Sequence, residues 1–329
     1  MKAITVNQIN YLNIGLMLIS CIVAFFLPFE LFLFSYAVLG PLHYLTEIGW
    51  LHKKNYYTKG KYDFVFLVLL CVLVFYFSYV QEAKSQTQVP NFVAYGLIIS
   101  AVFVFVKDTL YRVVICILAL IGLALTHFGS ETEYTYVIWV GVFLPTIIHV
   151  FIFTWLFMFY GVLKNKSLSG FLSVAALLLI SASFFIFRVP HLQYEVSEYI
   201  RSSYKQFYFL NTSLLDTFNM APEQVRDESS LVYQSNPGFV IMRFIAFAYT
   251  YHYLNWFSKT SVIQWHKVPR RTLVITLVIW IASVAIYRYD YNIGIKALFF
   301  LSFLHVFLEF PLNITSFHGI IQSLRGVKK

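Results

Sequence analysis

Long apolar stretches recur along this chain, and they constrain its fold more than any other feature of the sequence. A helix needs about 20 apolar residues to cross the hydrocarbon of a bilayer. Charged residues make up 12% of the sequence and hydrophobic residues 59%, whereas a soluble domain usually has about 25% charged residues. The pattern predicts an all-α, polytopic integral membrane helical bundle of about ten transmembrane helices. The predicted spans are residues 11–29, 31–51, 63–80, 92–106, 111–128, 136–163, 168–187, 238–257, 272–288 and 294–311.

Basic residues are concentrated at the ends of these stretches and give the expected orientation. Lys and Arg collect around residues 53–61, 107–112, 164–166 and 259–271, and again at the C-terminus. Because cytoplasmic connections carry an excess of Lys and Arg, the N-terminus and the C-terminus are both expected to be cytoplasmic. The net charge of +9 is then a topology signal and does not indicate a nucleic-acid partner. We expect a single transmembrane domain over 1–329 in a bacterial inner membrane, with an external loop or cap at about 188–237.

Three histidines are each followed four residues later by a glutamate, in or at the end of a predicted span. The pairs are His43 with Glu47, His127 with Glu131, and His305 with Glu309. Residues four apart lie on one face of a helix, so each pair can point into the interior of a bundle. Ionisable side chains at membrane depth are costly and usually functional. The pairs therefore indicate a buried metal site or a proton relay.

The candidate metal ligands are His43, His127, His252 and His305, with His149 as a further candidate. Each glutamate can bind the metal itself, or it can accept a hydrogen bond from a ligand histidine and fix its tautomer. Imidazole suits iron, copper and zinc, and four histidines with nearby carboxylates favour iron (Fe²⁺), as one ion or as a dinuclear centre. His127 lies near the outer end of its predicted span, and if that span is not shifted, His149 takes its place. The other histidines lie near interfaces or loops and are not expected to be ligands.

Other enzyme classes lack their motifs in this sequence. The clustered HxxxH and HxxHH boxes of membrane desaturases are absent, as are an HExxH helix, a glycine-rich phosphate loop and a nucleophilic Ser or Cys motif.

Three short segments carry a family resemblance. Gly40-Pro-Leu-His43, Thr126-His-Phe-Gly129 and Tyr251-His-Tyr-Leu-Asn-Trp256 resemble elements of the Brp/Blh family of membrane beta-carotene 15,15'-dioxygenases. The resemblance implies a non-haem iron centre with histidine ligands, in which dioxygen cleaves the central double bond of a carotenoid to give retinal. It implies His43, His127 and His252 as ligands. The family has a second histidine where this chain has Trp256, and His305, supported by Glu309, could restore the ligand count.

Our first hypothesis is a membrane-embedded non-haem iron oxygenase, whose lipophilic substrate enters from membrane lipid and reacts with dioxygen. Tyr44 and Trp256 are expected to contact the substrate. A second hypothesis is a dinuclear-metal lipid desaturase or hydroxylase. A third is a proton-coupled transporter in which the His/Glu pairs relay protons.

Overall fold

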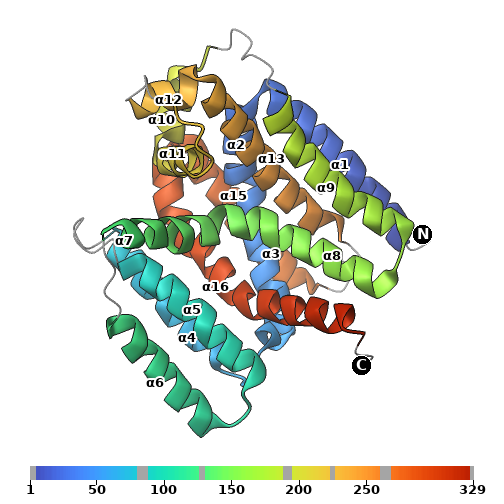
Figure 1. Cartoon of the computed structure of the whole chain (residues 1–329), viewed down its shortest axis with the longest axis vertical. Helices are drawn as coiled ribbons and strands as arrows, with labels where there is room; N and C mark the ends of the chain where they lie inside the picture. The colour runs from blue at the N-terminus through green and yellow to red at the C-terminus, as the bar shows by residue number, and fades with distance from the viewer. Residues whose placement is uncertain are drawn as a thin grey trace. The chain divides into compact units, whose positions relative to one another are not determined.

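The computed structural model describes residues 5–79, 88–125, 130–187, 195–222, 227–259 and 268–326 (Figure 1). About 90% of the structure is helical, and the described ranges contain no strand, which confirms the expected all-α class. Seven helical stretches are long and apolar enough to cross a membrane, so the chain is an integral membrane protein. They are Val6–Phe26 (α1), Pro28–Lys53, Gln88–Phe105 (α5), Glu133–Asn165, Leu168–Ile186 (α9), Arg270–Tyr289 (α15) and Tyr291–Leu324 (α16).

Three of the ten predicted spans are not among these seven stretches. Two of them, Asp63–Tyr79 (α4) and Thr109–Leu125 (α6), are apolar but shorter than the others. The third is Asn236–Ser258 (α13), a helix that mixes apolar residues with Arg243, His252 and other polar residues. All sixteen residues from Gly238 to Tyr253 are buried, so α13 is surrounded by protein and does not need a lipid-facing apolar surface. The number of spans and the sidedness of the termini stay predictions.

The chain forms two compact units, of which the first comprises residues 1–43 and 164–295. Its central element is α13, which packs against α1, α9 and Pro28–Phe34 (α2) (Figure 1). The buried face of α1 is formed by small and polar residues as well as apolar ones, among them Asn13 and Ser20. Asn13 is bonded to α13 through the hydroxyl groups of Ser258, at 3.0 Å, and Tyr251, at 3.1 Å. These bonds satisfy polar groups that water cannot reach at this depth.

Short helices from the predicted 188–237 segment also pack on this unit. In the described residues they are Glu198–Tyr204 (α10), Lys205–Phe207 (η5), Tyr208–Thr217 (α11) and Glu228–Gln234 (α12). An aromatic cluster joins them to α2: Phe29 and Phe32 both meet Tyr204 edge to face, at centroid distances of 5.2 and 5.3 Å. Such pairs add to the apolar area that the contact buries.

The second unit comprises residues 44–163 and 296–329. In it α5 packs against α4, α6 and the π-helical segment Val137–Phe153 (η4), which follows Ser130–Tyr136 (α7) and continues into Thr154–Asn165 (α8). The core of this unit is formed by side chains from α3, α4, α5, η4 and α16; its largest include Phe103, Phe307 and Phe310. A short 3₁₀ turn, Asn55–Tyr57 (η2), precedes α4. After it the Gly60 N–H donates a hydrogen bond to the carboxylate of Asp63, which also forms an ion pair with Arg112 at 3.0 Å.

Two π-helical segments interrupt the α-helices. Ser35–Leu39 (η1) joins α2 to Gly40–Lys53 (α3), and η4 contains Pro145. Proline removes a backbone donor and disturbs the regular helix. In the first unit, Trp280 Nε1 donates to the Val38 carbonyl at 2.8 Å, and the Tyr291 hydroxyl donates to the Leu33 carbonyl at 3.0 Å. Side chains therefore satisfy carbonyl groups at and beside η1.

Gly96 allows close packing of α5 on α16, and this gives a test of the second unit. A Cβ atom at Gly96 would lie 2.5 Å from a ring atom of Phe307. We expect Gly96→Ala to lower stability by about 1–3 kcal/mol, the usual cost of overpacking, measured as a lower unfolding temperature in detergent. The control is Gly122→Ala in α6, where a Cβ would meet nothing within 4 Å; it should be neutral or stabilise by up to about 1 kcal/mol. Equal effects of the two changes would contradict the packing.

Candidate metal centre

His43 and His252 form a buried pair in the first unit. His43 is 1% exposed and His252 is 7% exposed, and their Nε2 atoms lie 3.1 Å apart. The two rings meet edge to face, with centroids 4.6 Å apart. His43 comes from the first turn of α3 and His252 from the last third of α13.

Local structure fixes the position of this pair. η1 ends directly before Gly40, three residues ahead of His43. The hydroxyl groups of Ser35 in η1 and Thr250 in α13 share a hydrogen bond of 2.8 Å. This bond joins η1 to α13 two residues before His252. Gly40 leaves room for the Tyr253 ring, whose hydroxyl would lie 3.3 Å from a Cβ at this position. The Tyr253 ring in turn contacts His43 at a centroid distance of 5.2 Å. The small residue at position 40 therefore allows α13 to approach the start of α3.

His149 and His305 form the corresponding pair in the second unit. Their Nε2 atoms also lie 3.1 Å apart, and both side chains are buried. Glu309, 1% exposed, places Oε2 3.2 Å from Nδ1 of His149. A carboxylate beside Nδ1 attracts a proton to this nitrogen electrostatically, and a proton there would leave the Nε2 lone pair free to bind a cation. His149 follows Pro145 by four residues within η4, and π-helical segments are frequent at functional sites.

One ring nitrogen from each of His43, His149, His252 and His305 lies within 4.8 Å of the other three. The four histidines are therefore close enough to hold one metal ion. Two ligands at right angles around an ion and 3.1 Å apart would have bonds of about 2.2 Å, close to the usual 2.0–2.1 Å for imidazole nitrogen. A tetrahedral arrangement at the same separation would need bonds of about 1.9 Å, slightly shorter than usual. Both implied bond lengths lie within about 0.2 Å of the usual value, so the two nitrogens of each pair can reach one ion together.

The remaining predicted site residues have different outcomes. His127 lies outside the described residues, and Glu131 falls within α7, where the structure does not describe its side chain. Glu47 is 2% exposed and lies one turn after His43 on α3. Tyr44 places its ring 5.7 Å from that of His305, and Trp256 places its ring 5.6 Å from that of His43. Both predicted substrate-contacting aromatics therefore lie beside a histidine of the group.

Two buried amides near these histidines are not identified by the sequence analysis. Asn313 follows Glu309 by four residues on α16, and neither its Nδ2 nor its Oδ1 has a hydrogen-bond partner among the described residues. Asn255 follows His252 by three residues on α13, and its Oδ1 is likewise without a partner in the described part of the chain. Buried amides normally have partners. Each asparagine follows a candidate site residue by three or four positions, one turn of a helix, and this spacing is the sequence signal that could have indicated it.

Comparisons with known proteins give no family for this chain: no protein-family model matches the sequence, and no curated protein or solved structure matches it.

Metal content tests the four-histidine group directly. We expect His43→Ala and His149→Ala, one from each pair, to lower the amount of metal bound per chain well below that of the unaltered protein, because each removes a ligand. Metal is measured on purified protein by elemental analysis, and circular dichroism checks that the helices persist. His318→Ala is the matched control, since His318 is exposed and bonded to Gln322 at 2.7 Å. Unchanged metal in both buried variants would contradict the assignment.

Glu309 should act on the metal through His149. Loss of a carboxylate that orients a ligand histidine usually lowers metal affinity by about 10- to 100-fold, and we expect this from Glu309→Gln, measured by competition with a chelator. Glu133→Gln in α7 changes an exposed carboxylate of the same unit and should leave affinity unaltered. An affinity of Glu309→Gln equal to that of this control would exclude the positioning role.

Proposed function

We propose that His43, His149, His252 and His305 bind a single Fe²⁺ ion and that the protein is a membrane-embedded oxygenase acting on a lipophilic substrate. The observation that supports this proposal is the gathering of four buried imidazole nitrogens within 4.8 Å. In this ligand set His149 takes the place that the sequence analysis gave first to His127.

The charges near the group support a divalent cation. Neutral imidazoles carry no charge, so they cannot compensate a 2+ ion in a medium of low dielectric constant. Glu47 and Glu309 are both almost fully buried, and buried charges require partners of opposite sign. Two carboxylates would balance the charge of one divalent ion in this buried setting.

The donor set supports iron over the alternatives. None of the three cysteines belongs to the group, and Cys71 donates to the Phe300 carbonyl, so the soft thiolate ligands of structural zinc sites are lacking. Four imidazoles around an octahedral ion leave two positions open. Iron bound by the four histidines would supply the chemistry of dioxygen activation.

The surroundings of the histidines suit an apolar substrate. Tyr44 and Trp256 present aromatic rings beside His305 and His43, and aromatic side chains stack well on extended apolar molecules. The resemblance to the Brp/Blh motifs points to a carotenoid. Cleaving its central double bond with one dioxygen molecule puts one oxygen atom into each of two retinal molecules, so no external reductant is needed.

Expression in a carotenoid-producing bacterium tests this function. We expect the cells to lose their carotenoid colour and to form retinal. The process should consume dioxygen and require iron, and His252→Ala or His305→Ala should abolish it. His318→Ala should retain activity. Retinal is measured chromatographically, and metal is counted per chain in the same preparations.

Three results would contradict the proposal. Two metal ions per chain with a desaturated or hydroxylated lipid product would favour the dinuclear enzyme. Proton-coupled flux in metal-free liposomes would favour the transporter. Full activity of both buried-histidine variants would place the chemistry elsewhere.

A further inference from the structure

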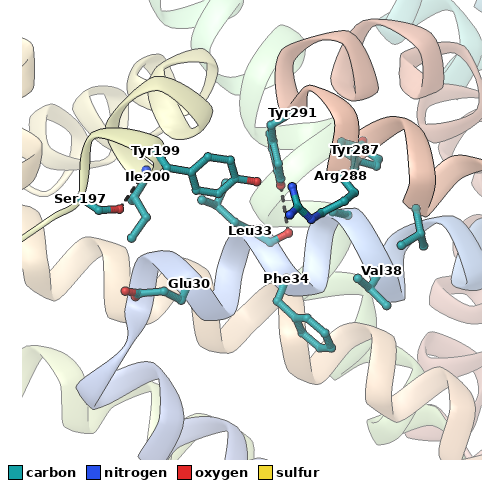
Figure 2. A pocket seen from close by; sticks show the side chains of 12 residues that line it. Glu30, Leu33, Phe34, Val38, Ser197, Tyr199, Ile200, Tyr287, Arg288 and Tyr291 are labelled. Atoms are coloured by element: carbon teal, nitrogen blue, oxygen red, sulfur yellow. Dashed lines mark hydrogen bonds between the residues drawn. The ribbon is translucent and has the colours of Figure 1, made fainter.

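A cavity of about 480 Å³ lies within the first unit, between α2, η1, the start of α10, the end of α15 and the start of α16 (Figure 2). Its volume is in the range of small-molecule sites, roughly 300–1,000 Å³. The walls are mostly apolar, formed by Leu33, Phe34, Ala37, Val38, Ile200 and Val284.

Two polar groups at this cavity have partners within the fold. The Tyr291 hydroxyl donates to the Leu33 carbonyl at 3.0 Å, and Ser197 Oγ accepts from the Ile200 N–H at 3.4 Å (Figure 2). These groups are therefore committed to the fold and are not free to recognise a ligand.

Two charged side chains at the cavity remain without partners. Glu30 Oε2 is buried and has no hydrogen-bond partner among the described residues. Arg288 is exposed and forms no ion pair within the part of the chain that the structure describes. Figure 2 shows the two side chains on different sides of the cavity, one from α2 and the other from α15. A ligand that bridges them would need both an anionic and a cationic group.

The cavity lies at the ends of membrane helices. Glu30 is in the first turn of α2, and Arg288 is in the last turn of α15. The ends of spanning helices lie at the level of lipid headgroups. Only 11% of the most apolar 18-residue stretch of α15 is buried. Phe34 at the cavity is 53% exposed, so apolar surface beside the cavity is accessible to lipid chains.

We propose that this cavity binds a phospholipid with an ethanolamine headgroup. Arg288 pairs with the phosphate, Glu30 accepts hydrogen bonds from the primary ammonium, and the apolar walls contact the upper part of the acyl chains. A choline headgroup carries the same charges, but its quaternary ammonium has no N–H and leaves the buried Glu30 oxygen unsatisfied. The buried Glu30 Oε2 atom thus selects ethanolamine over choline, since an unpaired buried acceptor is costly.

This site is separate from the candidate metal centre. Glu30 and His43 are thirteen residues apart on the helical stretch Pro28–Lys53, or about 20 Å along a helix axis. The lipid site therefore does not depend on the proposed function, and each can fail without the other.

Lipid binding to the full-length protein tests the proposal. Delipidated protein in detergent is titrated with phosphatidylethanolamine or phosphatidylcholine of identical acyl chains, and bound lipid is counted by native mass spectrometry. We expect phosphatidylethanolamine to bind roughly tenfold more tightly, the effect of one charge-assisted hydrogen bond. Glu30→Gln should remove this preference. Arg288→Gln should weaken both lipids, and Arg288→Lys should retain most of the binding.

Two variants that remove charges outside the cavity serve as controls. Glu228→Gln and Arg270→Gln change exposed charges away from the cavity and should alter nothing, and circular dichroism verifies the fold of every variant. Equal binding of the two lipids by the unaltered protein would overturn the proposal. So would tighter binding of phosphatidylglycerol that depends on Arg288 but not on Glu30, which indicates an anionic-lipid site. Equal binding of free phosphoethanolamine would show that no lipid is required.

Discussion

Polar groups at membrane depth must find their partners within the protein, because hydrocarbon offers no hydrogen bonds. This constraint accounts for the position of α13. A helix that carries Arg243, Thr250 and His252 cannot face lipid, and α1, α2 and α9 surround it. Asn13 on α1 supplies polar contacts to Tyr251 and Ser258. The same constraint explains why tryptophan and tyrosine side chains donate to the Val38 and Leu33 carbonyls at and beside the first π-helical segment.

The two π-helical segments lie close in sequence to two of the four histidines. η1 ends shortly before His43, and η4 contains His149. A π-helical turn changes the direction of the side chains that follow it relative to a regular α-helix. Glycine and proline accompany both places, with Gly40 and Pro41 before His43 and Pro145 before His149. Departures from regular helix therefore occur where two imidazoles must point toward partners from distant parts of the sequence.

The sequence predicts the helices well and the site only in part. Runs of apolar residues mark most spans within a few residues, and Pro28 separates the first two. Histidine and glutamate four apart indicate buried chemistry, as at His305 and Glu309. What local spacing could not indicate is that Glu309 lies beside His149, 160 positions earlier in the chain. That contact depends on the packing of η4 against α16 in the second unit, and helical periodicity carries no information about it.

The depth of the histidines bears on how reactants would reach them under the proposed function. Dioxygen and a polyene are both apolar, so both leave water for hydrocarbon readily. A centre lined by the Tyr44 and Trp256 rings needs no aqueous channel for either reactant. Under the proposed function, the buried carboxylates Glu47 and Glu309 would balance the charge of a divalent ion without water. Low dielectric constant would strengthen these interactions, so the burial that makes the polar groups costly would also help them to hold the ion.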